Sequence, residues 1–205
     1  MSEDLNAIQR AKAEIDGLVV QLSLGKSEAI EFIEGQKKTF TELVKDTEGR
    51  ITLSDLVDNE KTATIRQKLD QLRLQLALGK MESRDTYVDQ RDRINSAIDS
   101  VSGDLEPLKE SASEVLTEVL GGFQNGADSF KTKLNALALN LGLGMVVAED
   151  EAKLHKDRLQ GELAEVQANL KPSLDEAARR AQEAGAEAKT ALDGIRENLK
   201  TLLLP

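Results

Sequence analysis

The chain of 205 residues has no cysteine or tryptophan, one histidine, three prolines and only five other aromatic residues. The absence of cysteine excludes disulfide bonds, thiolate metal sites and thiol catalysis. A site that needs two imidazoles is also excluded, because His155 is the only histidine. With so few prolines, long segments contain no strong helix breaker. The composition therefore favours long helices, and it excludes sites that depend on thiols or on a pair of histidines.

The charge balance is acidic, with 27 basic residues against 37 acidic ones and a net charge of −10. This balance argues against a broad nucleic-acid surface, since phosphate contacts need clustered Lys and Arg. The hydrophobic fraction of 40% is enough to bury a core. No apolar run approaches the roughly 20 residues of a membrane-spanning helix, and the acidic N-terminus is unlike a signal peptide. We therefore expect a soluble cytoplasmic protein.

Helix signals run along the whole chain. Periodic apolar residues, punctuated by Gly and Pro, predict helices over about residues 4–46, 54–101, 106–120, 128–170 and 174–203. A loop is expected between the third and fourth of these, at Gly121, Gly122 and Gly126. At about 1.5 Å per residue the long helices would each span roughly 60–70 Å. The predicted fold is all-α, an elongated antiparallel bundle or coiled coil of four to five helices in a single domain, 1–205.

An internal repeat organises the three long helices. A Leu-x-Leu-Gly core occurs at residues 22–25, 76–79 and 141–144. Segments 15–46 and 69–100 are identical at 9 of 32 aligned positions, and the third copy keeps the Leu and Gly positions. The sequence therefore predicts that one long amphipathic helix was triplicated.

Each copy has an inner period of eleven residues, with apolar positions spaced by 3, 4 and 4. Eleven residues in three turns keep such a stripe on one face of a nearly straight helix. The stripe positions nearest the Leu-x-Leu-Gly core are predicted to form the core or interface: Leu18, Leu22, Leu72, Leu76, Leu137 and Leu141. The last helix differs, with an Ala-rich heptad seam that allows close packing.

Two features of these segments, the alternation of apolar residues and the repeated glycines, each have a second interpretation. Apolar residues alternate ahead of each repeated glycine, which is also a strand signature, although the residues are mostly Leu, Ala, Gln and Arg. The glycines themselves, Gly25, Gly79 and Gly144, are interpreted as points where helices cross closely. Alternatively they end helices as left-handed caps, and each copy is then a hairpin of two shorter helices.

Polar residues recur at two repeat positions. Gln36, Gln90 and His155 occupy one of them and are predicted to form a structural polar layer that fixes register. A metal site at His155 is not expected, because carboxylate bundles use paired Glu-x-x-His motifs. The second position is acidic in every copy, at Glu31, Asp85 and Asp150. Its acids are expected to stay on a solvated face without a fixed partner or to pair with a basic residue of a neighbouring helix, for which the candidates are Lys26, Lys37, Lys80, Arg91 and Lys156.

No catalytic, cofactor or metal residues emerge from the sequence. Gly25-Lys26-Ser27 resembles the end of a phosphate-binding loop, but the Gly required five residues earlier is Val20. We expect a non-enzymatic scaffold that binds a protein partner, or itself as an oligomer, through helix faces, with no nucleic acid and no small-molecule substrate. The alternative is a coat on lipid, droplet or granule surfaces. In its straight eleven-residue period about half the chain is similar to exchangeable apolipoproteins and granule- or droplet-coating proteins.

Overall fold

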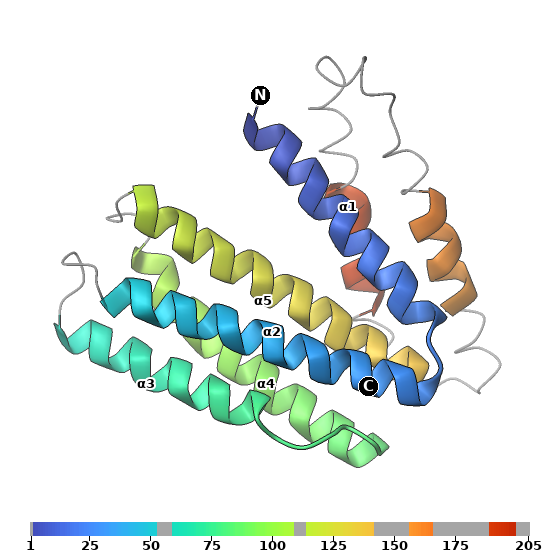
Figure 1. Ribbon diagram of the computed structural model, residues 1–205, viewed down its shortest axis with the longest axis horizontal. Helices are drawn as coiled ribbons and strands as arrows, with labels where there is room; N and C mark the ends of the chain where they lie inside the picture. The colour runs from blue at the N-terminus through green and yellow to red at the C-terminus, as the bar shows by residue number, and fades with distance from the viewer. Residues whose placement is uncertain (1, 53–58, 109–113, 142–155, 166–188, 200–205) are drawn as a thin grey trace. The chain divides into compact units, whose positions relative to one another are not determined.

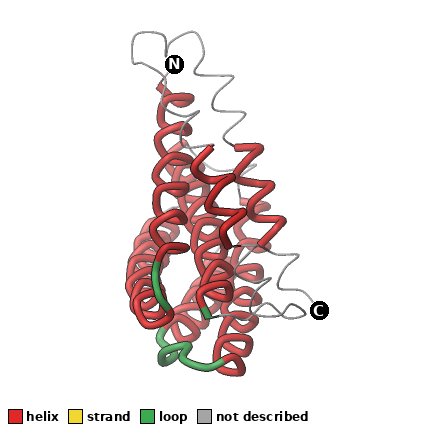
Figure 2. Tube along the Cα trace, turned by 90° about the vertical axis from the view of Figure 1, so that its right-hand side faces the viewer, coloured by secondary structure: helices red, strands yellow, loops and turns green. Residues whose placement is uncertain are grey.

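The computed structural model describes residues 2–52, 59–108, 114–141, 156–165 and 189–199. Within these ranges the chain forms helices joined by short links and contains no strand (Figures 1 and 2). The labelled elements are α1 (Ser2–Ser23), α2 (Lys26–Thr52), α3 (Asn59–Leu76), α4 (Arg84–Leu105), the short 3₁₀ helix η1 (Glu106–Leu108) and α5 (Glu114–Asn140). Residues 156–165 and 189–199 form two further helices. The prediction of an all-α bundle is confirmed for the described residues.

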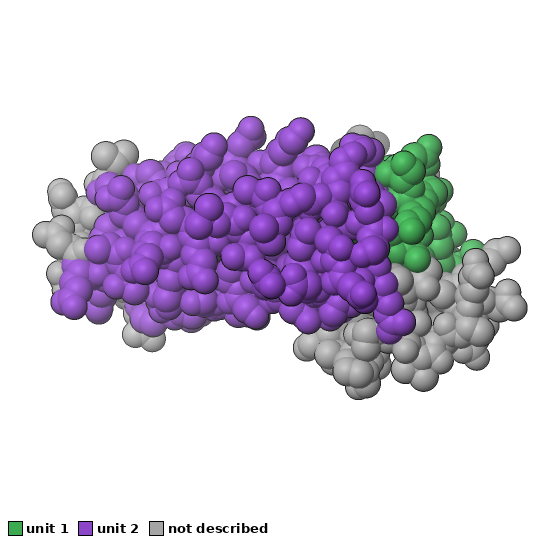
Figure 3. Space-filling view, turned by 90° about the horizontal axis from the view of Figure 1, so that it is seen from below, with its two compact units in different colours: residues 1–29, 135–205 green, residues 30–134 purple. Residues whose placement is uncertain are grey.

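The chain divides into two compact units, coloured separately in Figure 3. Unit 2 comprises residues 30–134, and unit 1 comprises residues 1–29 and 135–205. Helices α2 and α5 each contribute residues to both units, since the division falls within them.

Unit 2 is built from two pairs of packed helices. The ring of Phe40 in α2 stacks on Phe130 of α5 at 4.9 Å between centroids, and Phe123 of α5 lies 6.0 Å from the same ring. Helices α3 and α4 pack against each other as a hairpin, and the Nζ of Lys68 reaches Asp104 at 2.7 Å. Both pairs present buried apolar residues at helical spacing to the unit's interior.

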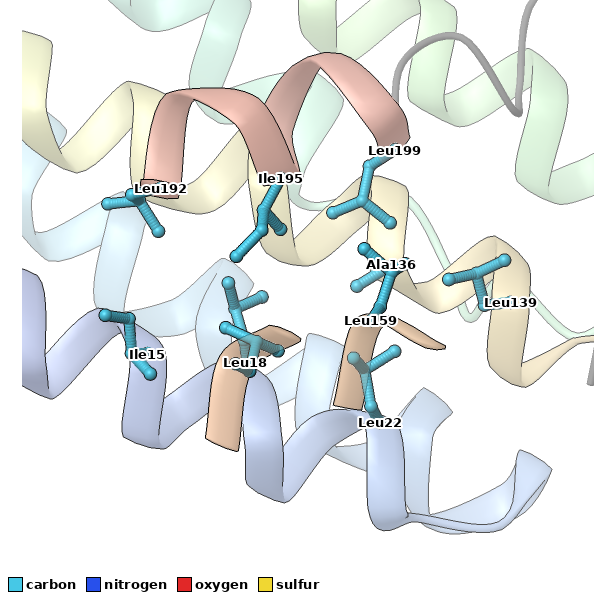
Figure 4. Packing of buried hydrophobic residues seen from close by; sticks show 10 residues of the cluster. Ile15, Leu18, Leu22, Ala136, Leu139, Leu159, Leu192, Ile195 and Leu199 are labelled. Atoms are coloured by element: carbon cyan, nitrogen blue, oxygen red, sulfur yellow. The ribbon is translucent and has the colours of Figure 1, made fainter. Parts of the chain in front are cut away.

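Unit 1 has its own hydrophobic cluster, which draws on four segments of the chain. Helix α1 contributes Ile15, Leu18 and Leu22, all at most 1% exposed. The remaining members come from the end of α5 and from the helices over 156–165 and 189–199: Ala136, Leu139, Leu159, Leu163, Leu192, Ile195 and Leu199. Figure 4 labels nine residues of this cluster, gathered between these helices. At about 1.5–3 kcal/mol for each large apolar side chain, this cluster is a substantial part of the stability of unit 1.

The first two long helices of the sequence prediction are each interrupted. The predicted helix 4–46 is broken at Leu24 and Gly25, between α1 and α2, and the predicted helix 54–101 is broken over residues 77–83, between α3 and α4. At both breaks, side chains from elsewhere in the chain bind backbone carbonyls that a continuous helix would use itself. Tertiary donors thus compete with the helical hydrogen bonds that local propensity favours.

The predicted loop after residue 120 is also wrong. Helix α5 runs through Gly121, Gly122 and Gly126 without a break. Its apolar residues keep a helical spacing across the glycines and are all buried: Leu116, Leu120, Phe123, Ala127, Phe130, Leu134 and Leu137. Burial of this face outweighs the cost of about 1 kcal/mol for each glycine in a helix.

Within the predicted helix 128–170, α5 ends at Asn140 and residues 156–165 form a separate described helix. Of the predicted helices 106–120 and 174–203, residues 109–113, 174–188 and 200–203 lie outside the described residues. None of the helices in the described ranges is both long enough and apolar enough to span a membrane.

Candidate functional site

A buried lysine stands at the centre of the most elaborate polar cluster in unit 2. Lys37 occupies a position of the apolar stripe on α2, between the buried residues Ile33 and Phe40. Its side chain is only 3% exposed. Lysine is almost never this deeply buried unless it is paired, so its partners define the site.

The Lys37 ammonium reaches three acceptors from two other parts of unit 2. Its Nζ donates to the backbone oxygens of Leu78 at 3.1 Å and Gly79 at 3.2 Å, both in the link between α3 and α4. It also donates to Gln90 Oε1 of α4 at 3.2 Å. Within α2, Glu34 Oε1 lies 2.8 Å from the same nitrogen. We refer to Lys37 and these four partners as the Lys37 cluster.

The geometry of the Lys37 cluster determines what it can do chemically. An ammonium group has three N–H donors, and four oxygens lie within 3.2 Å of this one, three of them as hydrogen-bond acceptors from other parts of unit 2. The Glu34 carboxylate compensates its charge, which burial would otherwise penalise heavily. Lys37 therefore ties α2 to the α3–α4 link and to α4.

Two further polar contacts join α5 to the same unit. Lys133 Nζ donates to Gln36 Oε1 of α2 at 2.8 Å, next in sequence to Lys37. The hydroxyl of Tyr87 on α4 donates to the backbone oxygen of Leu134 at 3.1 Å. Burial raises the pKa of Tyr87 well above its usual value of 10.0, although Arg91, 5.6 Å from the ring centroid, opposes this shift. The phenol therefore remains protonated and keeps its role as a donor.

Two of the three residues predicted to form a polar layer participate in these contacts. Gln90 accepts from Lys37, and Gln36 accepts from Lys133. Each amide therefore connects its own helix to a different neighbour in unit 2. The third predicted member, His155, lies outside the described residues.

In unit 1 a comparable polar contact involves the backbone oxygens at the C-terminal end of α1. Asn140 Nδ2 donates to the backbone oxygens of Gln21 at 3.0 Å and Leu24 at 2.8 Å. Lys156 Nζ adds a longer contact of 3.4 Å to the Leu24 oxygen. The Leu24 oxygen thus receives donors at the end of α1, where a helix leaves carbonyls without an internal partner, and the Gln21 oxygen accepts from Asn140 in addition to Leu24 N.

The predicted helix crossings at the repeated glycines are not found. Gly25 and Gly79 lie in the links between helices, and neither has a left-handed backbone. A Cβ at Gly79 would meet no atom within 4 Å, and one at Gly25 would meet only Glu28 Oε2, at 3.7 Å. Gly25 instead precedes α2, and its N–H donates to the Glu28 carboxylate at 3.1 Å, as in half of a capping box. Gly144 lies outside the described residues.

The close crossing occurs at a glycine that sequence reasoning assigned to a loop. A Cβ added at Gly126 of α5 would stand 2.2 Å from Leu43 Cδ2 and 3.9 Å from Phe40 Cε2, both on α2. Real Cβ atoms do not approach other atoms so closely, so a side chain at position 126 would require Leu43 to move. The apolar spacing on either side of Gly126 was the available signal.

The leucines predicted for the core are placed as follows. Leu18, Leu22, Leu72, Leu76 and Leu137 are at most 3% exposed, and Leu141 is partly buried. The alternating residues on the opposite face behave differently, since Val20 is 52% exposed and Leu74 is 68% exposed.

The surface of unit 2 carries ion pairs between helices. Lys80 pairs with Glu31, one of the repeated acidic positions, and the resulting hydrogen bond raises the pKa of Lys80. Glu48 of α2 faces two arginines of α3, at 3.5 Å from Arg66 and 3.2 Å from Arg73. Solvent screens pairs at the surface, so they align the elements that they join more than they stabilise them.

The described residues contain no group of three or more His, Asp or Glu side chains arranged to hold a metal ion. Comparisons with protein-family models, with curated proteins and with solved structures find no match for the chain.

Proposed function

We propose that this protein is a non-enzymatic structural or scaffolding protein that acts through helix–helix contacts with protein partners, its own copies included. The observation that supports this proposal is the use of its buried polar side chains. Lys37, Gln90 and Tyr87 are buried and bonded to other helices of unit 2. An enzyme would keep such groups accessible to its substrate. In this protein the same groups hold the helices together.

We further propose that the chain consists of three related helical hairpins. Corresponding residues at two of the links make corresponding contacts: Leu24 N bonds Gln21 O at 3.1 Å, and Leu78 N bonds Gln75 O at 3.3 Å. The backbone oxygens of Leu24 and Leu78 then each accept from a lysine, Lys156 and Lys37 respectively. These two lysines also occupy equivalent repeat positions. Shared contacts of this kind support descent from one hairpin and favour self-complementary surfaces.

Self-association tests the proposal directly. Size-exclusion chromatography with light scattering, run over a hundredfold range of protein concentration, should show a mass above the 22.4 kDa of one chain. Lysine-directed crosslinking in the same samples should yield covalent oligomers. A monomer at every concentration, without crosslinks and without a protein partner recovered from the source cells, would contradict the scaffold proposal.

A second function, the coating of lipid surfaces, is favoured by one observation. Leu18, Ala29, Phe40 and Ile51 are spaced by eleven residues, and all are at most 3% exposed, although the link at 24–25 separates the first from the others. If α1 and α2 joined, these residues would share one face of a long straight helix. Amphipathic helices with such faces lie on lipid.

Flotation separates the two functions. The purified protein is centrifuged under a density gradient with phosphatidylcholine vesicles, with anionic vesicles and with a triolein emulsion. The scaffold proposal expects it to remain at the bottom in all three. Recovery with the emulsion, together with a rise in helix content by circular dichroism, would instead establish the coating function.

A further inference from the structure

We infer that the α3–α4 hairpin can open at residues 77–83 into one continuous helix, and that a second copy of this chain covers the exposed face by exchanging α4. This inference rests on the proposed function and names its partner. The result is a domain-swapped dimer in which α4 of each chain packs on α3 of the other.

The first observation is the phase of the apolar stripe across the link. Ile65, Leu76, Tyr87 and Ile98 are separated by eleven residues each, and all are at most 3% exposed. The link lies between the second and the third of them. In a hairpin, the spacing of the apolar positions need not continue from one helix to the next. In a continuous helix it must continue, because otherwise the apolar residues would not share one face. The spacing keeps all four residues on one face of a straight helix from α3 through α4.

The second observation is that the backbone of the link is compatible with a helix. Gly79 does not adopt the left-handed backbone that would require glycine, and residues 77–83 contain no proline. The closed link is held by the bonds of Lys37 to Leu78 O and Gly79 O, by the pair of Lys80 with Glu31, by the burial of Met81 and by the N-cap at Ser83. In a continuous helix these two oxygens would accept from the N–H groups of Glu82 and Ser83. Opening therefore leaves no carbonyl of the link unsatisfied.

A second copy is the occupant that fits the opened face. Opening exposes Leu72 of α3 and Ile94 of α4, which are fully buried in the closed hairpin. The α4 helix of an identical chain can reproduce the contacts between α3 and α4, including Lys68 with Asp104 and Lys68 with the Ser100 oxygen, whereas the bonds of Lys37 to Leu78 O and Gly79 O are lost. Lys37 keeps Glu34 from its own helix and recovers Gln90 from the partner chain. The exchange gives up the contacts of the closed link and the translational and rotational freedom of two separate chains. The fraction of dimer therefore depends on protein concentration.

Glycine-to-alanine substitution at the link tests the opening. Gly79→Ala favours a helical link by about four- to fivefold, and a dimer contains two links, so its association constant should rise about twentyfold. Gly103→Ala is the matched control, because Gly103 lies within α4 in open space and is helical in both forms. Light scattering should show more dimer for Gly79→Ala and no change for Gly103→Ala. An equal effect of the two substitutions overturns the inference.

Crosslinking identifies the exchanged helix, and the cysteine-free chain makes the labelling specific. Gln67→Cys and Ser100→Cys chains are purified separately, unfolded together, refolded at high concentration and treated with a short bismaleimide. The bonds of Lys68 to Ser100 and Asp104 place residue 68, the next in sequence to Gln67, beside this part of α4. A crosslink between the two chains is expected. Gln67→Cys with Asp85→Cys, at the far end of α4, is the control pair and should not react.

Distance measurement within one chain completes the test. Spin labels at residues 67 and 100 lie within roughly 20 Å in the hairpin, since packed helix axes are 8–10 Å apart. In a continuous helix they lie about 50 Å apart. The dimer, diluted with unlabelled chain before refolding, should show the long distance and the monomer the short one.

The other outcomes are distinct. A dimer without the 67–100 crosslink supports self-association but overturns the exchange of α4. A monomer at every concentration, Gly79→Ala included, overturns both. A long distance that appears only with the triolein emulsion, on monomeric chains, overturns the second copy as occupant and supports lipid coating.

Discussion

Gly126 of α5 and Leu43 of α2 are in direct contact, so that a methyl group at position 126 would overlap Leu43 Cδ2 at 2.2 Å. The contact lies beside the stacked rings of Phe40 and Phe130. Substitutions at these two positions therefore test the packing of α2 against α5 in unit 2.

Gly126→Ala should destabilise the protein relative to Gly122→Ala. Both substitutions raise the helix propensity of α5 by about 1 kcal/mol. A Cβ at Gly122 meets no atom within 4 Å, whereas one at Gly126 forces Leu43 to move. Overpacking of this kind costs about 1–3 kcal/mol, which is the difference expected between the two variants in urea-induced unfolding.

The double variant Gly126→Ala/Leu43→Ala is the control for this contact. Leu43→Ala removes the atoms that the new methyl group meets, so the two substitutions should be non-additive, and the second should recover most of the penalty of the first. Additive effects would mean that Gly126 does not pack against Leu43.

Lys37→Met should lower the free energy of unfolding by about 3 kcal/mol, because it leaves a buried carboxylate and three acceptors without their donor. Lys38→Met is the matched control, since it removes the same charge from the next residue of α2, which is exposed. That variant should stay within about 0.5 kcal/mol of the parent chain. Denaturant unfolding followed by circular dichroism measures both. Equal losses of unfolding free energy in the two variants would show that removal of a positive charge, and not disruption of the Lys37 cluster, destabilises the protein.

The pH dependence of stability should report the burial of Tyr87. Since burial raises its folded pKa above the ordinary value of 10.0, the unfolded chain loses this proton first. Stability is therefore retained below pH 10.0, and above it the contribution of Tyr87 falls by about 1.4 kcal/mol per pH unit.

Two measurements isolate this effect from the titration of lysines. Tyr87→Phe should remove the alkaline loss while costing about 1 kcal/mol at neutral pH, because Leu134 O loses a donor. Tyr87 is the only tyrosine, so tyrosinate absorbance follows it directly. Ionisation at the ordinary pKa in the folded chain would contradict the burial of its ring and hydroxyl.

Leu18→Ala should destabilise unit 1 by about 2–5 kcal/mol, because Leu18 is fully buried in the cluster shared by α1 and the helices at 156–165 and 189–199. Val20→Ala, two residues away and 52% exposed, should change the stability by less than about 0.5 kcal/mol. Thermal unfolding of the two variants gives the comparison. Similar melting temperatures for both would show that the buried face of α1 was assigned incorrectly.

The positions of the apolar side chains could be read from the sequence because helical periodicity is a local property. Leu18, Leu72 and Leu137 follow from spacing alone, since the side chains three, four and eleven residues apart share a face whatever the helix packs against. The same regularity made the long helices look continuous, because nothing local distinguishes a stripe that crosses a link from one that does not. Gln36 and Gln90 were found as polar positions, but their partners were not.

Composition and period by themselves determined that this chain is helical, that it carries apolar stripes and that thiol and paired-imidazole chemistry are excluded. The tertiary structure decided where the helices end, because the carbonyls of Leu24 and Leu78 are bound by Asn140 and Lys37 from distant parts of the chain. It also decided which glycine allows a close crossing, because the space at Gly79 or Gly126 depends on the neighbouring helix. Such competition between local and long-range hydrogen bonds, and the distance to a packed neighbour, exist only once the chain has folded.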